Sequence, residues 1–220
     1  MFKDLCTIIY YTSNRENPEF EKKIQENILK QKGDIPIISV SQKPMDFGKN
    51  ICVGDVGFSY LNGMRQMLIG TKAATTPFVI STESDVLYPK DYFTFIPKEN
   101  ECYRYDNIWI VFKDRKYGNY KRKKYKYSEG VQICDRKLLI EKYEKFLENS
   151  PEWFNGESVI TKKGKEPFRG YSWKTFSGVP CISFKTGNGM RQSTPTQNNI
   201  PPVRNLPYWG DINDLRNKYL

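Results

Sequence analysis

The segment LCTIIYY, residues 5–11, decides the fold, because its β-branched and aromatic residues form one apolar run. Such a run is typical of a strand that is buried on both faces of a parallel sheet. In residues 18–32, apolar residues recur every four positions between charged ones and Gly33 follows, which predicts an amphipathic helix that ends there. Residues 35–40 (IPIISV) predict a second buried strand. A strand, a helix and a second strand in this order require a right-handed crossover and a parallel sheet.

The rest of the chain continues this α/β pattern and then changes in composition. Residues 41–57 contain Pro44 and three glycines, and we expect them to form an irregular loop. Further elements are expected in residues 59–74 (a helix with Ser59 as its N-cap), 78–81 and 108–112 (strands) and 136–147 (a helix). Seven of the 13 prolines lie beyond residue 150, so we expect a core in residues 1–150 and a loop-rich extension, residues 151–220, packed on the same domain.

Size and residue types narrow the class of protein. With 220 residues the chain is long enough for one α/β domain with decorations and too short for two ordinary domains. The sequence contains no histidine, which excludes Ser-His-Asp and Cys-His nucleophiles and HExxH metalloproteases. Any chemistry must therefore use carboxylates, Lys, Tyr, Ser or a metal held by oxygen. The five cysteines form no CxxC pair, which argues against zinc ribbons and disulfide frameworks and favours a reducing cytosol.

Most of the net charge lies in one short segment. Of the formal charge of +10, residues 113–126 (KDRKYGNYKRKKYK) supply +7, from eight basic residues and one acid. We expect a hairpin here with a turn at Gly118 and Asn119. Basic side chains bind phosphates and tyrosine rings stack on bases, so the segment favours DNA as a partner. The expected contacts are Lys113, Arg115, Lys116, Tyr117, Lys121, Arg122, Lys123, Lys124 and Lys126. A solvated hairpin without a partner, and peripheral contact with anionic lipid headgroups, are the alternatives.

Two carboxylates, Glu83 and Asp85, follow the strand expected in residues 78–81. In an open parallel sheet, ligands bind outside the carboxyl ends of the strands. Two carboxylates separated by one residue can both reach one hard cation, and Mg²⁺ or Mn²⁺ needs few protein oxygens when substrate phosphates complete its coordination. The alternative is that Glu83 is an acid on a loop and that Asp85 forms a turn.

Residues 5–96 resemble a GT-A glycosyltransferase in the order of their elements and in the segments TIIYYTSNR, IPIISVSQ and STESDVLYP. The resemblance implies a Rossmann-like three-layer α/β/α sandwich with a mostly parallel sheet. It also implies an enzyme that transfers a sugar from a nucleotide donor, such as a UDP-sugar, to a hydroxyl acceptor. In that family the base and ribose lie against the ends of the first two strands. A DxD-type motif after a later strand holds the metal and the sugar diphosphate.

The resemblance also assigns roles to residues. Glu83 and Asp85 correspond to the DxD motif and would hold Mn²⁺ or Mg²⁺, with Asp85 acting in catalysis. The nucleotide sugar would contact Thr12, Ser13, Asn14, Arg15, Ser41, Gln42 and Arg65, the last facing the donor phosphates. Many metal-dependent members add a histidine ligand, which this chain lacks, so fewer protein groups would hold the metal. In FKTGNGMR, Lys185 and Arg191 would neutralise phosphate charge as part of a lid, unless this segment is a solvated loop.

The acceptor side is expected between the basic segment and the helix at 136–147. An inverting transfer needs a carboxylate that takes the acceptor proton, whereas a retaining one does not. Glu129 is the first candidate base, because it stands where GT-A enzymes usually assemble the acceptor site, and Glu157 and Asp211 follow.

The basic hairpin favours DNA as the acceptor, and the chain then resembles the small DNA-modifying glycosyltransferases of phages, which place a sugar on a hydroxymethylated pyrimidine. The target base would be extruded from the duplex. A lipid-linked or surface polysaccharide precursor is the competing acceptor. A non-enzymatic nucleic-acid-binding protein and a carboxylate nuclease are hypotheses from other classes. No apolar run approaches the roughly 20 residues of a spanning helix, and no secretory signal is visible, so we expect a cytoplasmic protein, in the host cytoplasm if phage-encoded.

Overall fold

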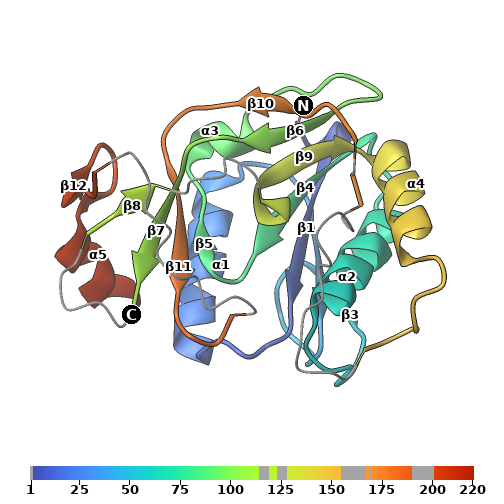
Figure 1. The fold of residues 1–220 in the computed structure, drawn as a ribbon, viewed down its shortest axis with the longest axis horizontal. Coiled ribbons are helices and arrows are strands. Elements are labelled where there is room, and N and C mark those ends of the chain that lie inside the picture. The colour runs from blue at the N-terminus through green and yellow to red at the C-terminus, as the bar shows by residue number, and fades with distance from the viewer. Residues whose placement is uncertain (1, 114–118, 123–127, 155–166, 169, 190–200) are drawn as a thin grey trace.

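A mostly parallel sheet forms the centre of the molecule. The computed structural model describes residues 2–113, 119–122, 128–154, 167–168, 170–189 and 201–220. Within these residues the main sheet has seven strands in the order β10-β6-β9-β4-β1-β2-β3 (Figure 1). Their bounds are β1 Cys6–Thr12, β2 Ile37–Ser41, β3 Lys49–Cys52, β4 Phe78–Glu83, β6 Cys102–Tyr105, β9 Gln132–Asp135 and β10 Lys174–Phe176. Strand β9 runs antiparallel to its neighbours β4 and β6, and the other pairs in this sheet are parallel.

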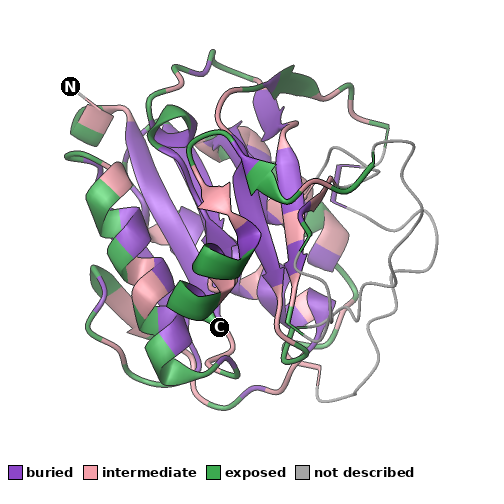
Figure 2. Cartoon of the chain, turned by 90° about the vertical axis from the view of Figure 1, so that its left-hand side faces the viewer, coloured by how far each residue is buried: buried purple, intermediate pink, exposed green. Residues whose placement is uncertain are grey.

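Helices cover both faces of this sheet. The helices are α1 (Pro18–Gln31), α2 (Tyr60–Ala73), α3 (Lys90–Phe93), α4 (Arg136–Leu147) and α5 (Ile212–Tyr219), with 3-10 turns η1 (Phe2–Asp4) and η2 (Glu129–Val131). Alternation along β1 sends Ile8 and Tyr10 into one core with α1, and Ile9 and Tyr11 into another with α2 and α4. Figure 2 shows the central strands of the sheet as almost wholly buried and the helices as buried on one side. The expected GT-A-type three-layer architecture is thereby confirmed.

A second sheet packs beside α1 and continues its core. It has the order β5-β11-β7-β8, formed by β5 (Val86–Leu87), β11 (Cys181–Lys185), β7 (Ile108–Phe112) and β8 (Lys121–Arg122). A small pair, β12 (Asn205–Leu206) and β13 (Gly210–Asp211), precedes α5. The C-terminal extension thus contributes β10 to the main sheet and β11 to the second. Strand β11 lies between β5 and β7, so the extension reaches the turn that follows β4.

Local sequence signals explain where the helices begin and end. The Asn17 side chain caps α1 by accepting from the Glu19 and Phe20 amides, and Pro18 occupies the first turn, where its missing N–H costs nothing. Ser59 caps α2 as predicted, accepting from the amide of Asn62 at 3.1 Å. Helix α4 has the bounds expected from the sequence. These caps fix the loops that lead from the sheet edge into α1 and α2.

Two details of the sequence prediction are wrong. The expected irregular loop at 41–57 contains β3, which pairs in parallel with β2. Strand β3 is short and lies at the edge of the sheet, and this position tolerates its polar residues. In the basic hairpin, Ile110 lies opposite Lys121. A two-residue turn at Gly118 and Asn119 would instead place Ile110 opposite residue 127, so the hairpin does not have that register.

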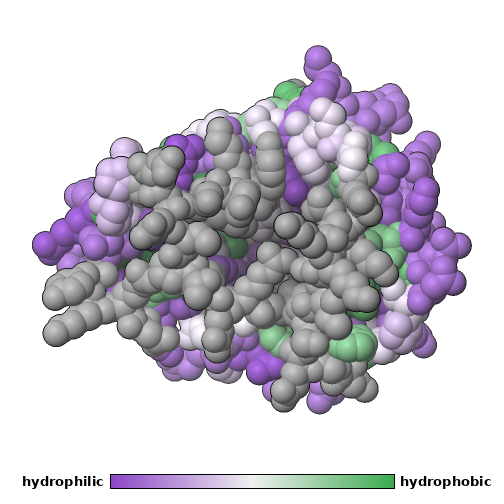
Figure 3. Space-filling view, in the orientation of Figure 1, coloured by the Kyte–Doolittle hydropathy of each residue, from purple (hydrophilic) through white to green (hydrophobic). Residues whose placement is uncertain are grey.

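The described surface is mostly hydrophilic. In Figure 3 apolar residues form scattered patches among polar ones on the face in view. The large hydrophobic residues that are exposed are Leu29, Ile96, Tyr208 and Leu220, and they come from separate elements. Among the described residues, every helix is too short or too polar to cross a bilayer.

Candidate active site

The carboxyl ends of β1, β2 and β4 meet at one edge of the main sheet. In the parallel register Thr12 at the end of β1 lies beside Ser41 at the end of β2. On the other side of β1, Tyr11 lies beside Glu83 at the end of β4. Three residues assigned to the site from the sequence, Thr12, Ser41 and Glu83, therefore stand next to one another.

Hydrogen bonds hold the Glu83 residue in place. The Tyr11 hydroxyl donates to Glu83 Oε1 at 2.7 Å. The Glu83 amide donates to the Tyr88 hydroxyl at 2.8 Å, and that hydroxyl donates onward to the Gly130 carbonyl at 2.7 Å. The fully buried Tyr88 hydroxyl therefore links the end of β4 to the short helix η2 through these two hydrogen bonds. The side chain of Glu83 then lies against Gly130, where no side chain intervenes.

Asp85 is held by the extension that returns through β11. The Phe184 amide donates to the Asp85 carbonyl at 2.8 Å, and Lys185 Nζ stands 3.2 Å from Asp85 Oδ2. Both side chains are largely buried, with 16% of Asp85 and 26% of Lys185 exposed. The sequence placed Lys185 near donor phosphates; in the structure its ammonium pairs with the proposed metal ligand.

Glu129 joins the same cluster from η2. Its carbonyl accepts a hydrogen bond from the Ser81 hydroxyl of β4 at 2.5 Å. Its Oε1 accepts from the Tyr60 hydroxyl at 3.2 Å and lies 3.7 Å from Arg104 Nη2. Arg104 itself is almost fully buried and stacks under the Trp173 ring at 3.5 Å. Glu129, predicted as the base, lies close enough to Glu83 for its charge to act on that carboxylate.

The charges of this cluster act on one another. Burial raises the pKa of Glu83 to about 7, and the negative charge of Asp85 adds to the effect. The hydrogen bond from Tyr11 and the ammonium of Lys185 act in the opposite direction, while Glu129 raises the pKa further. Three carboxylates thus share a partly buried site in which Lys185 and Arg104 supply the nearby positive charge.

The cluster fits a divalent cation that also binds a substrate. Carboxylate oxygens are the ligands that Mg²⁺ and Mn²⁺ prefer. A cation would favour the ionised form of Glu83, whose pKa is raised by burial first and by the charge of Asp85 next. Among the described residues, no group of three or more Cys, Asp and Glu side chains converges closely enough to form an all-protein metal cage. The donor set of Glu83 and Asp85 therefore suits an ion whose remaining ligands come from water and phosphate.

The loops after β1 and β2 form a polar wall beside the carboxylates. Asn14 joins the two loops, because its Oδ1 accepts from the Gln42 amide at 2.9 Å and from the Lys43 amide at 2.8 Å. Gln42 in turn donates to the Gly57 carbonyl at 2.6 Å. The Arg15 guanidinium lies 4.2 Å from the centre of the Phe58 ring. Ser13 is half-buried between these residues and the buried Thr12.

Glu16 is a buried acid that the sequence analysis did not single out. Its Oε1 accepts from the Thr186 hydroxyl at 2.9 Å, whereas its Oε2 is buried without a hydrogen-bond partner among the described residues. Burial raises its pKa, with a further contribution from Asp85. Sequence spacing does not predict this contact, because residues 16 and 186 meet only once β11 returns to the sheet edge.

Arg65 points elsewhere in this structure. Its guanidinium donates to the Pro151 carbonyl at 2.9 Å and lies 6.0 Å from the centre of the Trp153 ring. Asp211, the third candidate base, caps α5 by accepting from the Asn213 amide and pairs with Arg204 at 2.9 Å. Its pKa is lowered by the cap hydrogen bond first and by Arg204 next, as expected for a structural acid.

The base of the basic hairpin adjoins the cluster. The Lys113 amide donates to the Lys185 carbonyl at 3.0 Å, and Lys121 and Arg122 form β8 at the edge of the second sheet. The first residue of the hairpin, Lys113, is therefore hydrogen-bonded to Lys185, the residue that pairs with Asp85. The remaining expected DNA contacts, Arg115, Lys116, Tyr117, Lys123, Lys124 and Lys126, lie outside the described residues, as do Glu157 and Arg191.

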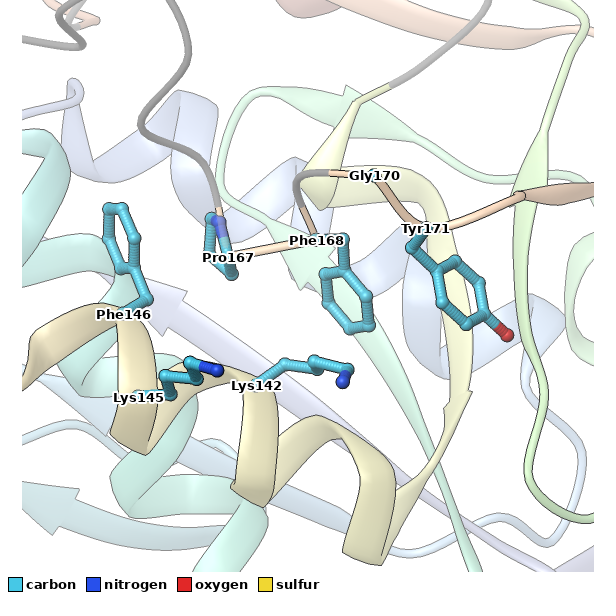
Figure 4. Close-up of a pocket in the computed structure, with 7 residues that line it drawn as sticks. All are labelled: Lys142, Lys145, Phe146, Pro167, Phe168, Gly170 and Tyr171. Atoms are coloured by element: carbon cyan, nitrogen blue, oxygen red, sulfur yellow. The ribbon is translucent and has the colours of Figure 1, made fainter.

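A pocket of about 330 Å³ lies between α4 and the described residues 167–168 and 170–171 (Figure 4). Two lysines of α4 and three aromatic rings face it, and its lining residues are Lys142, Lys145, Phe146, Pro167, Phe168, Gly170 and Tyr171. None of these residues belongs to the carboxylate cluster. The pocket is therefore a separate feature of the surface, and we do not assign the nucleotide to it.

Comparison with known proteins identifies a solved structure with a similar fold. No protein-family model and no curated protein matches the sequence significantly. The structure resembles residues 1–349 of S. aureus TarS, solved in complex with UDP-GlcNAc, with a TM-score of 0.52 and 14% identity. The chain shares the fold of this TarS fragment. The match covers 86% of this chain and 61% of the fragment, so the chain spans about three fifths of its relative.

Two further solved structures match more loosely. One is a glycosyltransferase involved in glycosylation of the major capsid of PBCV-1, with 15% identity, a TM-score of 0.43 and coverage of 79% of this chain and 82% of that one. The other is the mannosyltransferase PcManGT from Pyrobaculum calidifontis in complex with GDP-Man and Mn²⁺, with 14% identity, a TM-score of 0.44 and coverage of 81% and 56%.

Proposed function

We propose that the chain is a glycosyltransferase that moves a sugar from a UDP-sugar-type donor to a hydroxyl acceptor. The observation that carries the proposal is the position of Glu83 at the carboxyl end of β4, next to a polar wall, where the charges of Asp85 and Glu129 act on it. Ligands of open α/β sheets bind at this edge. The fold is shared with a TarS fragment that was solved with UDP-GlcNAc, which supports a nucleotide sugar as the ligand.

The donor would lie across the ends of β1, β2 and β4. The nucleotide would contact the polar wall through Thr12, Ser13, Asn14, Arg15, Ser41 and Gln42. Glu83 and Asp85 would hold Mn²⁺ or Mg²⁺, which would neutralise the charge of the leaving diphosphate when bound. Lys185, Arg191 and Arg65 remain proposed phosphate contacts, and Arg65 would have to leave the Pro151 carbonyl to serve as one.

Glu129 would serve as the general base in an inverting transfer. The acceptor O–H loses its proton to the Glu129 carboxylate while the acceptor oxygen forms a bond to the anomeric carbon. The bond from that carbon to the diphosphate oxygen breaks, and the diphosphate leaves with the electron pair. Arg104 and the Tyr60 hydroxyl orient the Glu129 carboxylate toward the cluster.

We further propose DNA containing a hydroxymethylated pyrimidine as the acceptor. The support is the basic, tyrosine-rich hairpin of residues 113–126, whose base is hydrogen-bonded to Lys185 beside Asp85. A phosphate backbone that followed this hairpin would bring a flipped base close to the carboxylate cluster. A glycan acceptor is the competing proposal, with the same donor chemistry.

Donor binding is tested by thermal unfolding with UDP and MnCl₂. A ligand at 100 times its Kd stabilises the folded state by about 2.7 kcal/mol, which corresponds to a rise in Tm of roughly 5–10 °C for a chain of this size. The rise should require both additives and disappear in Asp85→Asn. Asp214→Asn, on the exposed side of α5, is the matched control and should keep the shift. Salt-sensitive DNA binding without any such shift would support the non-enzymatic alternative.

The acceptor is tested by incubation with a panel of nucleotide sugars and DNA that contains hydroxymethylcytosine or hydroxymethyluracil, followed by nucleoside mass analysis. An added hexose or pentose mass would identify donor and acceptor together. Transfer to a glycan or lipid-linked acceptor, with none to DNA, would contradict the DNA proposal and leave the donor chemistry standing. Divalent-dependent cleavage of the DNA would point to a nuclease.

A further inference from the structure

Backbone hydrogen bonds hold both Lys185 and Asp85 in the positions where their side chains pair. Lys185 is the last residue of β11, which is held between β5 and β7. Asp85 stands in the turn between β4 and β5, and its carbonyl accepts from the Phe184 amide at 2.8 Å. The strands therefore place the two residues next to each other, and the ammonium lies 3.2 Å from Asp85 Oδ2.

The residues after Lys185 keep it over the carboxylates. The Thr186 hydroxyl donates to Glu16 Oε1 at 2.9 Å, and the Asn188 amide donates to the Thr186 hydroxyl at 3.2 Å. A β-carbon added at Gly189 would lie 4.0 Å from Asp85 Oδ2, so the turn that contains Gly189 lies next to the Asp85 carboxylate without crowding it. Segment 185–189 thus spans from the turn after β4 to the loop after β1.

A cation and the Lys185 ammonium would both seek the Asp85 carboxylate. Lysine carries a compact, hydrated positive charge on a flexible stem, so it satisfies a carboxylate electrostatically without fixing its geometry. A divalent ion that binds Glu83 and Asp85 would stand close to this ammonium and be repelled by it. A diphosphate bound at the same edge offers the ammonium other oxygens within reach, because it would share the metal with Asp85.

We propose that Lys185 competes with the divalent cation for Asp85, and that a nucleoside diphosphate removes this competition by drawing the ammonium to its own oxygens. The inference rests on the proposed function and adds a regulation of the same site. Metal binds weakly to the free protein and strongly to the nucleotide-bound protein. By linkage, the metal strengthens nucleotide binding by the same factor. The site therefore assembles only when donor and metal are both present.

The test measures the Kd of Mn²⁺ by isothermal titration with and without UDP, for the wild type and for Lys185→Met, which keeps the apolar stem and removes the charge. In the wild type UDP should tighten Mn²⁺ binding at least about fivefold, the lower end of typical coupling. Lys185→Met should bind Mn²⁺ more tightly than the wild type without UDP, by a similar factor. UDP should then add much less.

Two further variants keep the test specific. Lys185→Arg keeps the positive charge and should retain the weak metal binding of the free protein. Lys174→Met removes a lysine that pairs with Glu101 at the far strand β10, and it should leave the Kd of Mn²⁺ unchanged in both conditions. Thermal unfolding of each variant without ligands confirms that it is folded.

The outcomes separate this inference from the proposed function. If UDP strengthens Mn²⁺ binding equally in the wild type and Lys185→Met, and Mn²⁺ alone binds both with one Kd, the competition is refuted while the donor site stands. If Mn²⁺ and UDP bind to neither protein, the proposed function is refuted and the inference with it. Weaker Mn²⁺ binding to free Lys185→Met than to the wild type also contradicts the competition.

Discussion

The Glu83 carboxylate lies directly against the α-carbon of Gly130, so a β-carbon at residue 130 would overlap the carboxylate and its Cγ. Gly130 belongs to η2 and is not among the glycines with positive φ, so its backbone conformation is open to other residues. The glycine is therefore needed for space alone. It lets the end of β4 and the Glu129 segment approach closely enough for their carboxylates to share one site.

Gly130→Ala should separate the fold from the site. The overlapping atoms belong to the flexible end of Glu83, which can rotate away, so we expect a loss of stability of only about 1 kcal/mol. Glu83 would then lose its bond from the Tyr11 hydroxyl, and Mn²⁺ affinity in the presence of UDP should fall at least tenfold. Urea unfolding and Mn²⁺ titration measure the two quantities. An alanine variant that binds Mn²⁺ like the wild type would show that Glu83 is not a metal ligand.

The ligand-free protein should lose stability as the pH rises through the window between 4.5 and about 7. Below this window Glu83 is protonated in both the folded and the unfolded chain. Within it the unfolded chain releases the proton while the folded chain retains it, because the folded pKa is raised to about 7. At 1.36 kcal/mol per pKa unit, Glu83 lowers the free energy of unfolding by about 3 kcal/mol across the whole window.

Urea unfolding of the wild type and Glu83→Gln at pH 4.5 and pH 8, with a chelator present, measures this contribution. The wild type should lose more stability than Glu83→Gln across the window. Glu99→Gln, at an exposed position, is the control and should follow the wild type. Equal pH dependence in the wild type and Glu83→Gln would contradict the raised pKa. Adding Mn²⁺ with UDP should reduce the loss, because the cation favours the ionised carboxylate.

Asn14 variants should test the polar wall. Asn14 adopts φ of 54°, and its side chain accepts from two amides of the loop after β2. Asn14→Gly keeps the backbone conformation and removes the acceptor, so UDP should bind about tenfold more weakly if this loop contacts the nucleotide. Asn14→Ala adds a backbone strain of roughly 1–2 kcal/mol and should be less stable than Asn14→Gly. Unchanged UDP affinity in Asn14→Gly would place the nucleotide elsewhere.

The main sheet could be predicted because its strands and helices carry local signals. The apolar run of β1, the four-residue spacing of α1 and the cap at Ser59 each act within about ten residues. Strand β3 has no such signal, since its exposed, polar residues gain their pairing from the finished β2 beside it. The predicted hairpin register was wrong because a Gly-Asn pair favours a turn locally. The register is instead set by the pairing of both β8 residues with Trp109 and Ile110 of β7.

The candidate site was predictable only in part, for the same reason. Glu83 and Asp85 could be proposed because they follow a predicted strand, and Glu129 because it stands where GT-A enzymes usually assemble the acceptor site. The Lys185 pairing with Asp85 spans 100 residues of sequence and depends on β11 returning beside β5. Glu16 and Arg104 are partners of the site through the same kind of long-range contact, which a single sequence does not record.

Glu129→Gln should separate chemistry from binding. Glutamine keeps the shape of the side chain and can still accept from the Tyr60 hydroxyl, but it cannot take a proton from the acceptor. Loss of a general base lowers kcat by roughly 10²–10⁴-fold. Removing the negative charge of Glu129 makes Glu83 easier to ionise but also removes an attraction for the cation, so Mn²⁺ affinity should change little. A fall in kcat with intact Mn²⁺ and UDP binding is therefore the expected signature.

A second variant distinguishes the base from a structural acid. Arg104 contacts Glu129 and stacks under Trp173, so it acts as a positioning residue. Arg104→Lys keeps a positive charge near Glu129 and should retain part of the activity. Arg104→Met should lower kcat while leaving Mn²⁺ and UDP affinity unchanged, because it removes the group that positions the Glu129 carboxylate. If Glu129→Gln retains kcat within about threefold, Glu129 is not the base, and a retaining transfer without a protein base becomes the better account of the site.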